Sequence, residues 1–124
     1  MIRDLSDSVR QPSKPDRIRT ATESTFTSLI LEGEGPIVVE FMSYGCAYCR
    51  ELEPVLQRVA EMLPDNQKIF RVNTALAADL MSAYQVTGTP TLLMFLDGNE
   101  VARAAGPHPS VNAILEILRD AFES

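Results

Sequence analysis

The stretch IVVEFMSYGCAYCR, residues 37–50, joins an apolar run to two cysteines that stand three positions apart. Residues 37–42 are mostly branched and nearly continuous in apolarity, as in a central strand that is covered on both faces. Residues 50–63 place apolar side chains at helical spacing. Positions i and i+3 share one face of a helix, so Cys46 and Cys49 can close a small disulfide with little backbone movement. A C-x-x-C pair beside a strand–helix unit is typical of a redox motif rather than a structural bridge.

The composition predicts one soluble domain in a reducing compartment. The chain has 124 residues, of which 45% are hydrophobic, and none of its apolar runs approaches the roughly 18 residues that span a bilayer. Residues 1–17 lack the apolar centre of a secretory signal, and two cysteines are too few for a disulfide-rich secreted scaffold. We therefore expect a cytoplasmic protein without membrane association. The net charge of −6 argues against nucleic acid as a partner.

Turn signals and hydrophobic periodicity divide the chain into a tail and one α/β domain. Residues 1–16 contain two prolines and three serines with little periodicity, which predicts a flexible N-terminal tail. Residues 17–124 form the predicted domain. Its helices alternate with its first strands, so we expect one mixed β-sheet with helices on both faces. The expected strands are 17–21, 37–42, 68–73, 91–96 and 100–104, and the expected helices are a first one capped by Thr22 or Ser24, then 50–63, 75–84 and a last one capped by Ser110.

Several further residues accompany the cysteine pair at consistent intervals. They are Glu40-Phe41, Pro54, Gly88-Thr89-Pro90-Thr91, Phe95, Gly98 and Gly106. With these residues, positions 17–124 resemble the thioredoxin family. The resemblance implies the thioredoxin fold, thiol–disulfide exchange and a cis peptide bond before Pro90. It also implies that the backbone of Thr89 binds an extended substrate peptide beside the active site.

The chain departs from the usual thioredoxin pattern at three places. Gly45 stands where thioredoxins usually have tryptophan, Ala47-Tyr48 stands where they usually have Gly-Pro, and Arg71 stands where many members have lysine. A tyrosine second in the central pair is similar to some bacterial disulfide isomerases. These departures leave the direction of exchange and the substrate open.

The two thiols are expected to have different roles. Cys46 lies at a predicted helix N-terminus, where unpaired N–H groups and the helix dipole stabilise a thiolate. The dipole alone is too weak for a large pKa shift, so a second donor is needed, and the Cys49 thiol is the nearest. We predict that Cys46 is the nucleophile and that Cys49 is the buried resolving thiol.

Glu40 interrupts an apolar strand, and two roles fit a buried carboxyl group at this place. It can accept the proton of Cys49 through water, as the family's acid at this position suggests. It can also form a structural ion pair with Arg71 on the adjacent strand. Such a pair would keep Glu40 ionised and make it a weaker base.

The residues around the pair are candidate substrate contacts. Tyr44, Gly45, Ala47 and Tyr48 are expected at the rim of the site, although both tyrosines also fit exposed positions. Gly106 fits either a close backbone approach or an ordinary turn. We expect no metal and no cofactor, because tetrahedral zinc needs four ligands and the chain offers two thiols and His108, which is expected to face solvent.

Three functions remain open at this point. The leading one is a monomeric oxidoreductase that reduces protein disulfides and receives electrons from a separate reductase. Tyr48 motivates a disulfide isomerase or oxidase instead. The substitutions at Gly45 and Ala47 motivate a non-catalytic peptide-binding adapter, against which the presence of both cysteines speaks.

Overall fold

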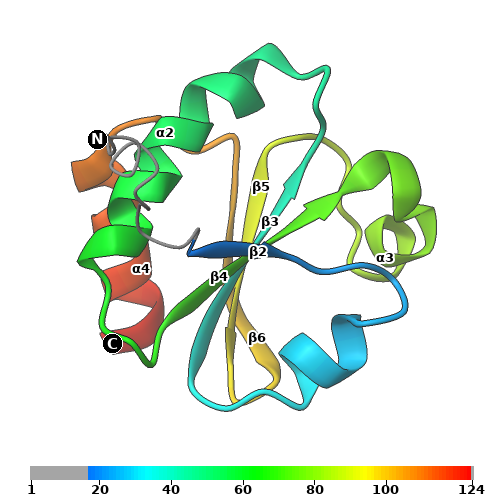
Figure 1. Ribbon diagram of the computed structural model, residues 1–124, viewed down its shortest axis with the longest axis horizontal. Coiled ribbons are helices and arrows are strands. Elements are labelled where there is room, and N and C mark those ends of the chain that lie inside the picture. The colour runs from blue at the N-terminus through cyan, green and yellow to red at the C-terminus, as the bar shows by residue number, and fades with distance from the viewer. Residues whose placement is uncertain (1–16, 124) are drawn as a thin grey trace, which may run out of the picture.

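A five-stranded mixed sheet runs through the centre of the protein (Figure 1). The computed structural model describes residues 17–123. The strand order is β2-β4-β3-β5-β6, with β2 and β3 parallel to β4, β5 antiparallel to β3, and β6 antiparallel to β5. The predicted single mixed sheet is therefore confirmed. The bounds are Ile18–Thr20 for β2, Pro36–Met42 for β3, Lys68–Asn73 for β4, Thr91–Leu96 for β5 and Asn99–Ala105 for β6.

Helices cover both faces of this sheet, as predicted. Helices α2 (Ala47–Met62) and α4 (Val111–Glu123) lie on one side. Helix α3 (Ala78–Ala83) and the short π-helix η1 (Thr27–Leu31) lie on the other (Figure 1). The predicted tail, residues 1–16, lies outside the described residues, and the extent of the domain stays a prediction.

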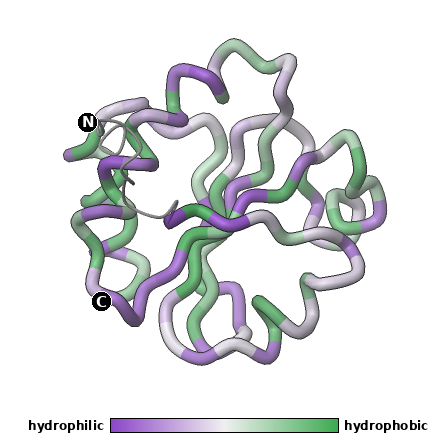
Figure 2. The backbone as a smooth tube through the Cα atoms, in the orientation of Figure 1, coloured by the Kyte–Doolittle hydropathy of each residue, from purple (hydrophilic) through white to green (hydrophobic). Residues whose placement is uncertain are grey.

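Alternate residues of the central strands supply two separate hydrophobic clusters. Val39 faces the cluster beneath η1 and α3, whereas Val38 faces the cluster beneath α2 and α4. Figure 2 shows the hydrophobic character of the central strands from which both clusters are built. Because strand side chains alternate between faces, Glu40 lies on the same face as Val38 and points toward α2. This face also carries the active-site helix.

Two predicted helices differ in detail from those in the structure. The first predicted helix is the π-helix η1, and its N-cap is Phe26, which makes no side-chain capping bond. The predicted cap at Thr22 or Ser24 is wrong, because these hydroxyl groups hydrogen-bond to each other at 3.0 Å. Such local side-chain bonds compete with helix formation. The predicted helix at 75–84 is a 3₁₀ turn, η2 (Thr74–Leu76), followed by α3, and Ala77 separates the two with a φ of −141°.

The last helix begins as predicted. The Ser110 hydroxyl accepts a hydrogen bond from the backbone N–H of Ala113 at 3.2 Å, which satisfies one of the free donors of the first turn of α4. Helix α2 begins at Ala47, earlier than the predicted position 50, and continues through Pro54. Both cysteines therefore belong to its start.

Candidate active site

The cysteine pair lies where β3 leads into α2. Cys46 is the N-cap of α2, with an extended backbone (φ −92°, ψ 116°), and its Sγ accepts a hydrogen bond from the backbone N–H of Cys49 at 3.1 Å. The Cys46 thiol also donates to the carbonyl oxygen of Thr89, with the two atoms 3.6 Å apart. Both cysteines are free thiols. Cys46 is half-buried, whereas Cys49 is only 3% exposed.

The surroundings shift the proton affinities of the two thiols in opposite directions. Hydrogen bonding from the Cys49 thiol, and then from Thr89, lowers the pKa of Cys46 below its ordinary value. Burial, and then the hydrogen bond to Cys46, raises the pKa of Cys49. Cys46 is therefore the sulfur that ionises first, and the thiolate is the reactive form in disulfide exchange.

Glu40 is completely buried beside this pair. Its exposed fraction is 0%, and neither carboxyl oxygen has a hydrogen-bond partner among the described residues. Burial first, and the charge of Glu53 second, raise the pKa of Glu40 from 4.5 to about 7, although Arg71 acts to lower it. A carboxyl group with this pKa can exchange a proton at neutral pH.

The ion pair between Glu40 and Arg71, one of the two roles that the sequence left open, is not the one that forms among residues 17–123. Both residues lie on the same face of the sheet and are partners in the register of β3 and β4. The Arg71 guanidinium nevertheless donates to Glu53 on α2, with Nη2 and Oε2 2.5 Å apart. Arg71 lowers the pKa of Glu40, as expected, but burial and the charge of Glu53 outweigh this effect, so the pKa is raised to about 7.

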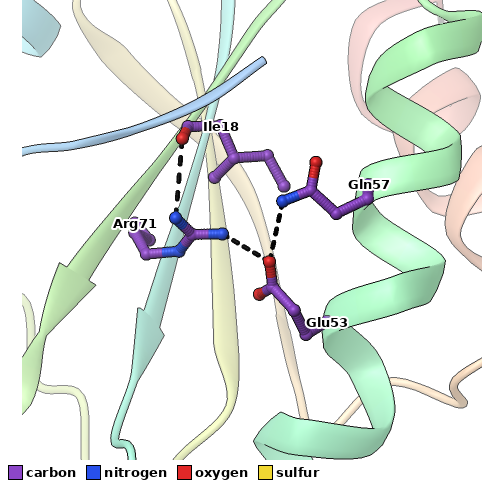
Figure 3. Close-up of polar contacts among 4 residues, drawn as sticks. All are labelled: Ile18, Glu53, Gln57 and Arg71. Carbon is purple, nitrogen blue, oxygen red and sulfur yellow. Dashed lines mark hydrogen bonds and ion pairs between the residues drawn. The ribbon is translucent and has the colours of Figure 1, made fainter. Parts of the chain in front are cut away.

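Glu53 is the residue that the sequence analysis missed. It follows Cys49 by four positions, so both lie on one face of α2. The four-residue spacing from Cys49 was the one sign that Glu53 could belong to the site. It did not indicate that Glu53 binds a residue on a strand 18 positions away. Figure 3 shows Glu53 between Arg71 and Gln57, which both bond to its carboxylate.

The loops opposite the cysteines close the site from the other side. The peptide bond between Thr89 and Pro90 is cis, as the resemblance implies. The carbonyl of Pro90 accepts a hydrogen bond from the N–H of Gly106 at 2.8 Å. The Tyr48 hydroxyl donates to the carbonyl of Pro107 at 3.1 Å. The structure thus brings Tyr48, Thr89, Pro90 and Gly106 together around the cysteine pair, although they come from three separate segments.

The other predicted rim residues lie in the loop before α2 and in its first turn. Tyr44 is 68% exposed, and its carbonyl accepts a hydrogen bond from the Arg50 side chain at 3.1 Å. Gly45 and Ala47 are exposed as well. A β-carbon added at Gly45 would meet no atom within 4 Å, so a side chain could begin there without a clash. His108 is exposed, as expected.

A cavity of about 270 Å³ opens beside the buried thiol. Its lining includes Cys49, Glu53 and Arg71 together with the loop residue Tyr44. Within residues 17–123, no group of three or more side chains is placed to hold a metal ion, and no helix is long and apolar enough to cross a membrane.

Comparisons with known proteins agree on one family. Residues 17–119 match the family model named Thioredoxin. Thioredoxin 1 of Synechococcus elongatus is 34% identical over 88 residues, which cover 71% of this chain and 82% of that protein. The thioredoxin of Pseudomonas aeruginosa is 32% identical over 91 residues, which cover 73% and 84%. These relatives do not favour either alternative function, whether the disulfide isomerase or oxidase, or the non-catalytic adapter.

A solved structure supports the fold independently. A mutant thioredoxin from Halobacterium salinarum superposes with a TM-score of 0.77 over 92% of this chain and 98% of that one, at 24% sequence identity. At this identity the likeness bears on the fold alone. Taken with the family model, the two relatives and the paired thiols, it leads to one conclusion: the chain belongs to the thioredoxin family, has the thioredoxin fold and is a thiol–disulfide oxidoreductase.

Proposed function

We propose that Cys46 attacks a disulfide of a protein substrate and that Cys49 completes the reduction. The Cys46 thiolate forms a bond to one substrate sulfur, and the other substrate sulfur leaves as a thiolate. Cys49, once deprotonated, then attacks Cys46, releases the second substrate thiolate and leaves the Cys46–Cys49 disulfide. Two electrons pass from the enzyme to the substrate. This assignment depends on one observation: the pKa of the half-buried Cys46 is lowered, whereas the pKa of the buried Cys49 is raised.

In this proposal Glu40 accepts the proton that Cys49 must lose. A buried thiol with a raised pKa needs a base before it can attack. Glu40 is the carboxyl group that the sheet places beneath α2, and its pKa of about 7 suits a proton acceptor at neutral pH. The transfer moves one proton from the thiol of Cys49 to the carboxylate of Glu40, through a water molecule.

The rim residues are proposed to hold the substrate as an extended strand. The backbone of Thr89 lies against Cys46, so a peptide that bonds to this backbone would bring its disulfide to the reactive sulfur. Tyr44, Gly45, Ala47, Tyr48, Pro90 and Gly106 would surround it. Membership of the thioredoxin family supports reduction as the direction, and we propose a separate reductase as electron donor and a monomer in the cytoplasm as the working form.

The assignment of the two sulfurs is tested by reducing insulin with dithiothreitol and following the turbidity. We expect that Cys46→Ser is no faster than dithiothreitol alone. Cys49→Ser should still attack and should accumulate a mixed disulfide through Cys46, which the intact mass reveals. A mixed disulfide captured equally well by the Cys46→Ser variant would contradict the assignment.

The direction of exchange is tested by the reduction potential. Equilibration with glutathione should give a value close to the roughly −270 mV of thioredoxins. A value near −120 mV, typical of a strong disulfide oxidant, would instead support an oxidase.

A further inference from the structure

Arg71 is placed to neutralise Glu40 but binds another acid. The two residues are register partners on adjacent parallel strands, with their side chains on the same face. Yet Arg71 donates through Nη2 to Oε2 of Glu53 and through Nη1 to the carbonyl of Ile18, at 2.5 and 3.5 Å. Neither oxygen of Glu40 has a hydrogen-bond partner among the described residues. Glu53 therefore binds the cation that is the register partner of Glu40.

The pair of Glu53 and Arg71 is held in place at both ends. Gln57, one helical turn after Glu53, donates to the same carboxyl oxygen at 2.8 Å, as Figure 3 shows. The Arg71 side chain is 13% exposed and that of Glu53 is 36% exposed. A charge-assisted hydrogen bond that is sheltered in this way is stronger than an exposed ion pair. Arg71 is thus fixed toward α2.

We propose that Glu53 is a positioning residue for the resolving step: by binding Arg71 it withholds this cation from Glu40 and so keeps Glu40 able to accept the proton of Cys49. This inference rests on the role of Glu40 in the proposed function. The step itself transfers one proton from the Cys49 thiol to the Glu40 carboxylate and requires no further reactant.

The groups that face Glu40 support this role. Glu53 and Cys46, from α2, raise the pKa of Glu40, and Arg71, from β4, lowers it. The register partner on β5 is the apolar Leu92. Loss of the Glu53 charge would remove one repulsion and would also release Arg71 toward Glu40. Both changes act in the same direction and would lower the pKa of Glu40.

The cavity of about 270 Å³ links this pair to the resolving thiol. Cys49, Glu53 and Arg71 all line it. The ion pair and the thiol that must lose its proton therefore adjoin the same cavity.

The test is a ¹³C NMR titration of the Glu40 side-chain carboxyl carbon in the reduced full-length protein. We expect that Glu53→Gln moves the titration downward from about 7 by about one unit or more. Glu61→Gln is the matched control, because it makes the same change at an exposed position of the same helix, and it should leave the titration in place. An unmoved titration in Glu53→Gln would overturn the proposal.

A second variant background distinguishes the release of Arg71 from the loss of repulsion by the Glu53 charge. In Arg71→Met, the shift caused by Glu53→Gln should fall to less than half, because there is no cation to release. A shift of equal size in both backgrounds would show that Glu53 acts only through its own charge and would overturn the proposal.

The resolving step is then followed in single turnovers. The pH dependence of substrate release should move downward together with the titration, and Glu53→Asp should restore most of it. If the titration moves and the release profile does not, the proton-acceptor role of Glu40 in the proposed function fails. The titration uses no substrate, so the two failures are distinguishable.

Discussion

Glu40 shows how burial decides the chemistry of a single residue. In water a glutamate is ionised at pH 7, but β3 carries Glu40 into the interior, where the charged form loses its hydration. The resulting rise of its pKa to about 7 means that the folded protein holds a proton which the unfolded chain has already lost. The proposed proton acceptor therefore also affects the stability.

The contribution of Glu40 to the stability should fall as the pH rises from 4.5 to above 7. In this window the unfolded state binds fewer protons at this site than the folded state, so the free energy of unfolding decreases with pH. A shift from 4.5 to about 7 corresponds to roughly 3 kcal/mol. Glu40→Gln removes the ionisation, so its advantage over the wild type should grow by roughly this amount between pH 4.5 and pH 8.

Urea unfolding at a series of pH values measures this effect. Glu116→Gln, an exposed position on α4, is the control and should show no such growth. A difference between Glu40→Gln and the wild type that stays constant with pH would mean that Glu40 ionises alike in the folded and unfolded states.

At the scale of elements, α2 uses one face to pack against the sheet and the neighbouring face to hold residues of the site. Leu52, Leu56 and Val59 form its buried stripe against the sheet. Cys49, Glu53 and Gln57 follow one another at intervals of four residues and so share the neighbouring face. The helix therefore holds the thiol of Cys49 and the partner of Arg71 rigidly with respect to each other. Its N-terminus supplies the N–H group that bonds to Cys46.

The turn between β5 and β6 depends on a glycine. Gly98 has a φ of +86°, and a β-carbon added there would lie 2.3 Å from the carbonyl oxygen of Leu31. Gly98→Ala should therefore lower the free energy of unfolding by about 1–3 kcal/mol, from backbone strain and the contact with η1. Gly88→Ala, where an added β-carbon meets nothing within 4 Å, is the matched control. Urea unfolding compares the two, and equal stabilities would contradict the expected clash.

The whole molecule has two hydrophobic clusters on opposite faces of one sheet. Ile30 belongs to the cluster under η1 and α3, and Ile114 belongs to the cluster under α2 and α4. Because every central strand contributes to both clusters, we expect that the described part of the chain unfolds as one cooperative unit. A single unfolding transition would agree with the prediction that residues 17–124 form one domain.

Substitutions in both clusters test this cooperativity. Ile30→Val and Ile114→Val should each cost about 0.5–1.5 kcal/mol, and the double variant should equal their sum within about 0.5 kcal/mol, because the sites share no contacts. Circular dichroism and tyrosine fluorescence should report the same urea midpoint. Two separate transitions would contradict a single domain.

Local pattern determined much of this protein. The spacing of Cys46 and Cys49, the apolar run before them and the order of strands and helices are properties of neighbouring residues, and they predicted the fold, the redox pair and a buried acid at Glu40. The resemblance to thioredoxins added the cis bond before Pro90. These features could be predicted because hydrophobic periodicity and turn residues act over a few positions.

Tertiary structure alone decided which distant side chains meet. The sequence placed Arg71 beside Glu40 but did not indicate that the guanidinium reaches across to Glu53 on α2. It did not indicate the bond between Tyr48 and Pro107, which lie 59 positions apart, or that between Cys46 and Thr89, which lie 43 apart. Such pairings depend on strand register, on the seating of α2 above the sheet and on side-chain reach, and packing fixes all three only after the chain has folded.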